Sequence, residues 1–113
     1  MLSDCCGIVY AMDIISGRWK MLILYNLEEK KLRFSEIKKL IPNITERMLT
    51  LQLKELERDN LIKRSIYVEV PVRVEYELTS EALKLSPIWH ALEIWGDEHR
   101  ELNWQADEEK VMA

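Results

Sequence analysis

The sequence lacks the features that identify membrane and secreted proteins. No apolar run reaches the roughly 18–20 residues that a membrane-spanning helix needs. The first residues, MLSDCCGIVY, contain no basic stretch followed by an apolar one, as a signal peptide would. The two cysteines, Cys5 and Cys6, are adjacent, so they do not make a disulfide framework. We therefore expect a cytoplasmic protein in a reducing compartment, with no membrane contact.

Patterns for catalysis and cofactor binding are also scarce. The three glycines, Gly7, Gly17 and Gly96, lie far apart, which excludes a glycine-rich phosphate loop of the usual signature. His90 and His99 have no spacing that pairs them with a thiol as a nucleophilic dyad. Adjacent cysteines do not match the C-x₂-C spacing of metal sites. The sequence predicts no enzyme, and no metal or cofactor site.

Charge is unevenly distributed along the chain. Residues 30–73 carry eleven Lys or Arg against six Asp or Glu, a net charge of +5. The rest of the chain carries five against fourteen, or −9, which gives the overall −4. Local potential, rather than total charge, governs contact with phosphate. The middle of the chain is therefore the candidate for binding nucleic acid.

Residues 32–61 have the pattern of two helices joined by a tight turn. The first helix is predicted to begin at Ser35 as its cap. Pro42 and Asn43 mark the turn, and Thr45 is the predicted N-cap of the second helix. Such a pair, with a basic second helix, is typical of a helix-turn-helix that places its second helix in the DNA major groove.

Each of these helices has a predicted inner side. The inward residues of the first helix are Ile37, Leu40 and Ile41, and those of the second are Leu49, Leu53 and Leu56. The opposite side of the second helix carries Arg47, Thr50, Leu51, Lys54 and Arg58. On helical period alone this is also the pattern of an ordinary amphipathic surface helix, so its neighbours in the chain decide the interpretation.

Residues 62–78 change to a period of two, which is typical of β-strands. One face of the first predicted strand carries Ile62, Ile66, Val68 and Val70. Because a two-stranded hairpin is marginal alone, we expect it to pack on the helices. The run breaks at Pro71-Val72 without an Asn-Gly or Asp-Gly turn, so we expect a hairpin with a loose tip over residues 70–73. Directly after a recognition helix, such a hairpin is a wing whose Arg73 reaches phosphate or the minor groove. The alternative is a purely structural hairpin.

Helices are predicted over residues 7–16, 18–27 and 80–103, the last with a break at Pro87. The apolar stripe of the last helix is wider than a small domain needs, so we expect the first and last helices to pack against a second subunit. The predicted interface residues are Ile8, Met12, Ile88, Trp89, Leu92 and Trp95. The fold class is mainly α with a small β-hairpin: one winged helix-turn-helix domain over residues 1–113, with dimerisation helices at both ends.

The chain resembles the HxlR-type winged helix-turn-helix regulators of bacteria. The residues that carry the resemblance are Cys6, Gly17-Arg18-Trp19-Lys20, Leu32-Arg33-Phe34, Ile44-Thr45, Arg47-Met48-Leu49-Thr50, Gln52-Leu53, Leu56-Glu57, Leu61-Ile62, Arg64, Tyr67, Val70-Pro71, Arg73-Val74-Glu75-Tyr76, Leu78-Thr79, Pro87, Leu92 and Trp95-Gly96. The resemblance implies a homodimer, formed by the first and last helices, that binds a pseudo-palindromic double-stranded DNA operator as a repressor or activator. It also implies, for some members, sensing of oxidants or electrophiles through the cysteine that Cys6 matches.

Three positions depart from the family pattern. Leu51 stands where members often carry a polar residue, and we interpret it as a contact to a thymine methyl group rather than an idle surface leucine. Val72 replaces a frequent second proline at the wing tip. Cys5 adds a thiol beside Cys6, which complicates sensing by a single cysteine.

The candidate DNA contacts fall into two groups, because base contacts select sequence and phosphate contacts supply affinity. Groove contacts are predicted for Thr45, Arg47, Thr50, Leu51 and Lys54, with Arg47 as the guanine contact. Backbone contacts are predicted for Arg33, Ser35, Arg58, Tyr67 and Arg73.

Cys6 is the candidate sensor, because the dipole at a helix N-terminus favours the thiolate. The alternative is a small apolar residue that packs in the core. Two alternative functions also remain: a dimeric winged-helix module for protein interaction, and a regulator that binds a small ligand at the dimer seam near Trp89 and Trp95.

Overall fold

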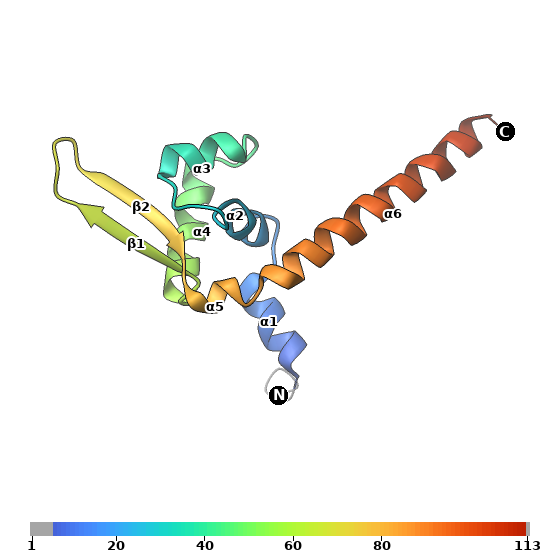
Figure 1. Ribbon diagram of the computed structural model, residues 1–113. Coiled ribbons are helices and arrows are strands. Elements are labelled where there is room, and N and C mark those ends of the chain that lie inside the picture. The colour runs from blue at the N-terminus through green and yellow to red at the C-terminus, as the bar shows by residue number, and fades with distance from the viewer. Residues whose placement is uncertain (1–5, 113) are drawn as a thin grey trace.

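The computed structural model describes residues 6–112, and side chains for residues 6–103. The elements are α1 (Gly7–Ile15), α2 (Lys20–Asn26), α3 (Phe34–Leu40), α4 (Glu46–Arg58), β1 (Ile62–Tyr67), β2 (Arg73–Leu78), α5 (Ser80–Leu83) and α6 (Ser86–Met112). The predicted fold class, mainly helical with one small hairpin, is confirmed (Figure 1). Cys5 lies outside the described residues.

The core lies where α2, α3 and α4 meet. The predicted leucine stripe of α4 is fully buried there: Leu49, Leu53 and Leu56. From α2 they meet Ile23 and Leu24, and from α3 Ile37. Apolar burial of this extent stabilises the trihelical unit by roughly 1.5–3 kcal/mol per large side chain, so the leucines fix which side of α4 faces outward.

The hairpin extends the core on one side. β1 and β2 pair in antiparallel register from Ile62↔Leu78 to Tyr67↔Arg73. Leu32, just before α3, adds a short bridge to Tyr76 through two backbone hydrogen bonds of 2.9 and 2.8 Å. The hairpin is thereby fixed at its root to the segment that leads into α3, while its tip projects away from the helices (Figure 1).

The two end helices leave the core. α1 buries none of its nine residues, and α6 extends away from the other elements to the chain's C-terminal end (Figure 1). The molecule measures 63 × 39 × 24 Å, an elongation that a 27-residue helix, about 40 Å long, explains. Among the described residues, no helix is both long and apolar enough to cross a membrane.

Some local predictions are wrong, each for a physical reason. α3 begins one residue before Ser35, because the Glu36 carboxylate accepts the Arg33 backbone N–H at 2.8 Å and closes the helix start there. Leu40 is 52% exposed, since Ile37 and Ile41 already occupy the inner side of this short helix. The last helix is broken as predicted, but around residues 84–85 rather than at Pro87, and α6 continues past residue 103 to Met112.

The hairpin is buried only at its root. Ile62 is buried, but Ile66 is exposed, and Val68 and Val70 are 95% and 103% exposed. The period of two is correct for the backbone, yet only the root of the hairpin has a core to pack against. The hairpin therefore packs on the helices at its root, and beyond the root the apolar face of β1 meets solvent.

Candidate nucleic-acid interface

Helix α4 is built to begin at a defined residue. The Thr45 side chain accepts the Met48 backbone N–H at 3.0 Å, as predicted for an N-cap. Glu46 follows in the first turn, where a negative charge stabilises the helix dipole. The Thr50 hydroxyl donates to the Glu46 carbonyl at 2.8 Å, so its lone pairs remain available as acceptors. The first two turns of α4 are therefore ordered before any ligand binds.

The outer face of α4 carries the predicted groove residues. Thr45, Arg47, Thr50, Leu51 and Lys54 are all exposed. Neither Arg47 nor Lys54 forms an ion pair with any described residue, so both cations are free to meet an anionic surface. Arg58, at the end of the helix, instead forms an ion pair with Asp59 at 3.2 Å. Positive charge on α4 is thus available toward its N-terminal and middle turns.

Arg33 and Ser35 lie at the start of α3, and both are exposed. Arg33 is the N-cap of α3 and Ser35 its second residue, so both belong to a different element from the predicted groove residues on α4.

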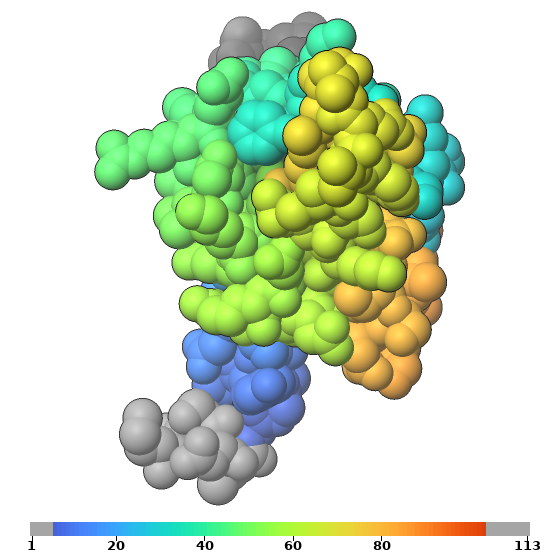
Figure 2. Space-filling model, turned by 90° about the vertical axis from the view of Figure 1, so that its left-hand side faces the viewer, coloured from blue at the N-terminus to red at the C-terminus, as the bar shows by residue number. Residues whose placement is uncertain are grey.

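A cleft of about 300 Å³ separates α4 from the hairpin. Its walls are Thr50, Leu53, Lys54 and Glu57 from α4, with Arg64 and Tyr76 from the strands. Figure 2 shows α4 and the hairpin side by side on this face of the molecule. Arg64 was missed as a site residue, although a signal was present: it lies two positions after the buried Ile62 and so shares the face of β1 that turns toward α4.

Tyr67 and Arg73 occupy the other face of the hairpin. They pair directly in the register, and the Arg73 guanidinium lies 4.2 Å from the centre of the Tyr67 ring. Arg73 Nη2 is 3.1 Å from Glu69 Oε1, and its Nε is 3.4 Å from Glu75 Oε1 without a hydrogen bond. The structure therefore commits this arginine, predicted to hold DNA phosphate, to two carboxylates of its own hairpin.

A buried ion pair fixes the orientation of α4. Lys20 on α2 is 8% exposed, and its Nζ lies 3.0 Å from Glu55 Oε2 on α4. Sequence periodicity gives no signal for this contact, because a lysine at the start of a helix is normally solvated. The pair constrains how α4 lies on α2 and hence where Arg47 and Lys54 point.

A second connection links the helix-turn-helix to α6. The Glu28 carboxylate, just after α2, accepts hydrogen bonds from the Ser86 hydroxyl, the Trp89 indole N–H at 3.3 Å and His90 Nε2 at 2.6 Å. The Ser86 bond above all, then the Trp89 and His90 contacts, lower the pKa of Glu28 below its ordinary value. Three donors from the first turns of α6 thus converge on one carboxylate that follows α2. We refer to α2, α3, α4 and the hairpin together as the reader unit.

The predicted dimer surface is exposed, except at one residue. Ile8 and Met12 on α1, with Ile88, Leu92 and Trp95 on α6, all meet solvent in the single subunit. Trp89 is only 3% exposed. Its placement at an interface is therefore wrong for this subunit, because its indole packs in the core and donates to Glu28.

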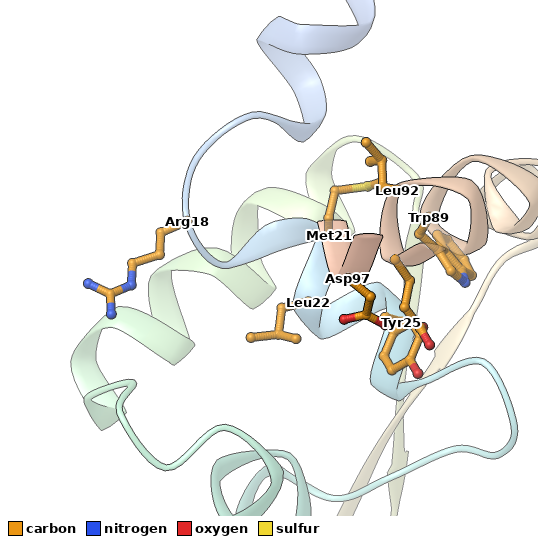
Figure 3. A pocket seen from close by; sticks show the side chains of 8 residues that line it. Arg18, Met21, Leu22, Tyr25, Trp89, Leu92 and Asp97 are labelled. Atoms are coloured by element: carbon orange, nitrogen blue, oxygen red, sulfur yellow. The ribbon is translucent and has the colours of Figure 1, made fainter. Parts of the chain in front are cut away.

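An open groove of about 590 Å³ lies between α2 and α6 (Figure 3). It is lined by Arg18, Met21, Leu22, Tyr25, Trp89, Leu92, Glu93 and Asp97. Trp95, which the ligand-pocket alternative also invoked, does not line it. Figure 3 shows the Arg18 side chain directed away from the apolar residues of the groove. Leu92 lines this groove and also belongs to the predicted dimer surface, so the two exposed apolar regions are continuous.

Cys6 occupies the N-cap position of α1 and its thiol is exposed. The backbone N–H groups of Val9 and then Ile8 lower the pKa of the thiol below its ordinary value, although the thiol makes no regular cap hydrogen bond. The alternative of a packed, apolar cysteine does not hold for this exposed position. Among the side chains of residues 6–103, no three His, Cys, Asp or Glu gather as metal ligands.

Known proteins similar to this chain match it over most of its length. Residues 14–103 match the HxlR-like helix-turn-helix family. The HTH-type transcriptional regulator YdeP of Bacillus subtilis (strain 168) is 47% identical over 96 residues, covering 85% of this chain and 75% of that protein. An HTH-type transcriptional regulator of Methanothermobacter thermautotrophicus is 52% identical over 91 residues, covering 80% and 70%.

Solved structures agree with this relationship. The reduced form of the redox regulator HypR superposes with a TM-score of 0.82 at 40% identity, covering 86% of this chain and 96% of that one. A putative HTH-type transcriptional regulator, ytcD, gives a TM-score of 0.81 at 44% identity, covering 85% and 98%. The chain belongs to the HxlR-like helix-turn-helix family of transcriptional regulators.

Proposed function

We propose that this regulator binds a pseudo-palindromic duplex operator as a homodimer, with α4 of each subunit in a major groove. The observation that carries the proposal is the division of α4 into a buried leucine side and an outer side with two cations, Arg47 and Lys54, that pair with none of the described residues. Arg47 suits the O6 and N7 acceptors of guanine, and Leu51 suits a thymine methyl group. The net charge of +5 over residues 30–73 adds affinity for phosphate.

The homodimer is supported by the apolar surface that one subunit leaves uncovered. α1 has a mainly apolar sequence, GIVYAMDII, and buries no residue, whereas a nine-residue helix is not stable alone in water. Exposed Leu92 and Trp95 on α6 supply a matching apolar surface. A second copy that covers both helices also positions two α4 helices for two half-sites about 34 Å apart.

The test of DNA binding begins with selection of bound sequences from a random duplex pool. The selected duplex and a scrambled duplex are then titrated across a salt series. We expect a preference for the selected duplex of about 10³-fold or more, with affinity falling steeply as salt rises. Equal weak binding of both duplexes at low salt would favour the protein-interaction alternative.

The test of the homodimer uses charge on the uncovered surface. Ile8→Glu and Trp95→Glu should each shift the chain from dimer to monomer in sedimentation velocity, because a carboxylate in an apolar interface is poorly solvated. Leu83→Glu, at an exposed leucine of α5, is the matched control and should stay dimeric. A wild-type chain that sediments as a monomer at micromolar concentration contradicts the proposal.

A second part of the proposal concerns the signal. We infer that Cys6 reacts with oxidants or electrophiles and thereby changes operator binding. An exposed thiol whose pKa is lowered by backbone N–H groups is more nucleophilic at neutral pH. The solved relative HypR is described as a redox regulator, with structures in oxidised and reduced forms.

Diamide is a suitable probe of this chemistry. Two thiols become one disulfide, and the azo group of diamide takes up the two electrons and two protons as a hydrazine. Operator binding by wild type should change after diamide and recover with dithiothreitol, whereas Cys6→Ser should not respond. Cys5→Ser is the control for the adjacent thiol. An unchanged diamide response in Cys6→Ser removes Cys6 as the sensor.

A further inference from the structure

The loop that joins the two strands of the hairpin is unusually apolar. Val68, Val70 and Val72 are 95%, 103% and 62% exposed, and Pro71 beside them is also exposed. Hairpin tips are normally built from Gly, Asn, Asp and other polar residues. We refer to residues 68–72 as the valine tip. Contact between these apolar side chains and water is unfavourable, so a ligand that covers them gains free energy of binding.

The valine tip has no cation of its own to offer a phosphate. Glu69 is the loop's charged residue, and Arg73 at the start of β2 is held by Glu69 and Glu75 and stacked on Tyr67. Lys31 Nζ lies 4.0 Å from Glu75 Oε2. The pKa of Lys31 is raised chiefly by a hydrogen bond with Tyr67. The positive charge around the tip is therefore already neutralised within the protein.

The length of the hairpin fits the spacing of grooves in duplex DNA. Six residues per strand extend about 20 Å at 3.3–3.4 Å per residue. One turn of duplex is about 34 Å, so a major groove and the next minor groove are roughly 17 Å apart. The root of the hairpin packs beside α4 at the cleft lined by Lys54 and Arg64. With α4 in the major groove, the hairpin is therefore long enough to bring the valine tip to the flanking minor groove.

The chemistry of the minor groove allows apolar contact with valine side chains. Its walls are deoxyribose C–H groups, and at A·T pairs its floor lacks the guanine N2 amino group. A·T-rich minor grooves are also narrow, which brings both walls within contact of a small apolar side chain, and apolar residues are known to enter minor grooves. Glu69, already paired with Arg73, adds little net repulsion of phosphate.

We propose that the valine tip reads the minor groove that flanks each half-site by apolar contact, and that it selects A·T-rich flanks without a cationic contact. The inference rests on the proposed operator binding and names a further determinant of its specificity. A protein partner is the poorer occupant, because three valines and a proline fall well short of the roughly 800 Å² that each partner buries in a stable interface.

The experiment compares three versions of the selected duplex that differ only about half a helical turn outward from each half-site. The flanks are A·T pairs, G·C pairs or inosine·cytosine pairs. Inosine·cytosine presents the major-groove acceptors of G·C but lacks the amino group in the minor groove. The proteins are wild type, Val70→Ser/Val72→Ser, and Leu83→Ser as a control at an exposed apolar residue elsewhere.

Wild type should bind the A·T and inosine·cytosine flanks about tenfold more tightly than the G·C flanks, a ratio in keeping with partial burial of valine side chains. The double variant should lose this preference while keeping the wild-type slope of log affinity against log salt. Leu83→Ser should behave as wild type. Equal binding of all three duplexes by wild type, or a double variant that keeps the preference, overturns the inference.

Two further outcomes separate the possibilities. If wild type binds no duplex, the proposed function itself fails. If the double variant matches wild type on every duplex but removes a self-association seen in sedimentation, the valine tip is a protein contact and the inference is wrong. Thermal unfolding of each variant checks that these exposed substitutions leave the fold intact.

Discussion

Arg47 is the residue on which sequence recognition depends most in this account. It is exposed, unpaired among the described residues, and lies in the first turn of a capped helix. Arg47→Ala should cost about 1–3 kcal/mol on the selected duplex and relax the preference at one base pair, because a bidentate contact to guanine is lost. Fluorescence anisotropy against a panel of single-base variants measures both effects.

The matched control for Arg47 is Arg100→Ala on the outer part of α6, where Arg100 pairs with Asp97. It should leave affinity and base preference unchanged. A uniform loss with Arg47→Ala on every sequence, the scrambled duplex included, would show that Arg47 contacts only phosphate.

Arg64 and Arg73 allow a direct comparison of two arginines on one hairpin. Arg64 lines the cleft beside Lys54, whereas Arg73 is paired with Glu69 and Glu75. Arg64→Ala should reduce the slope of log affinity against log salt by about one unit, and Arg73→Ala by clearly less. The reverse order would mean that Arg73 leaves its carboxylates to bind DNA.

Glu28 connects the reader unit to α6 through an ionised carboxylate. Its pKa is lowered in the folded protein, first by the Ser86 hydroxyl and then by Trp89 and His90. It therefore adds stability above the ordinary carboxyl pKa of about 4.3, and that stability is lost as pH falls through the lowered value. Glu28→Gln should unfold at a lower temperature than wild type at pH 7, and the gap should narrow as pH falls below the ordinary carboxyl pKa of about 4.3.

Thermal unfolding followed by circular dichroism from pH 3 to pH 8 measures this effect. Glu29→Gln, next in the chain but exposed, is the control and should show no such pattern. A gap between Glu28→Gln and wild type that stays constant across the range would mean that the ionised form has no special role.

At the scale of elements, the position of α4 depends on Lys20 and Glu55. Lys20→Met leaves a partly buried carboxylate without its partner, which should cost about 2 kcal/mol, below the 3–5 kcal/mol of a fully buried pair because Glu55 is 29% exposed. Lys20→Met combined with Glu55→Gln should recover much of the stability. Urea unfolding of the two single variants and the double variant measures the coupling, and additive losses would show that no coupling exists.

Periodicity predicted the elements well where one side of an element meets the core. The α4 stripe and the Thr45 cap follow from side-chain spacing and local hydrogen bonding alone, and both are confirmed. The N-cap of α3 was predicted at Ser35 and lies two residues earlier, at Arg33, because the Glu36 carboxylate accepts the Arg33 backbone N–H. Local sequence patterns therefore predict the presence of a helix more accurately than the residue at which it begins.

Contacts between distant segments were the part that the sequence could not predict. Trp89 and Leu92 both lie on an apolar stripe of α6, yet only Trp89 turns to the core of its own subunit. The pairing of Lys20 with Glu55, and of Arg73 with two carboxylates, joins residues that carry no shared local pattern. For the candidate site, the outer face of α4 was predictable, whereas Arg64 and the neutralised wing required the fold.

At the scale of the whole molecule, a compact reader unit is attached to two helices that leave it. The reader unit contains the core and the free cations of α4, and the end helices contain the uncovered apolar side chains. The Glu28 contacts lie where α6 joins the reader unit. In the proposed dimer, this junction is the place where a change in how α6 packs would be transmitted to the rest of the subunit.

The central claim is that two copies of α4 enter successive major grooves on one side of a duplex. Hydroxyl-radical footprinting of the selected duplex tests it most directly. The account predicts two protected regions centred about 10 base pairs apart, roughly 34 Å along the duplex, that weaken together with Arg47→Ala. A single protected region, or protection that persists unchanged in Arg47→Ala, would contradict it.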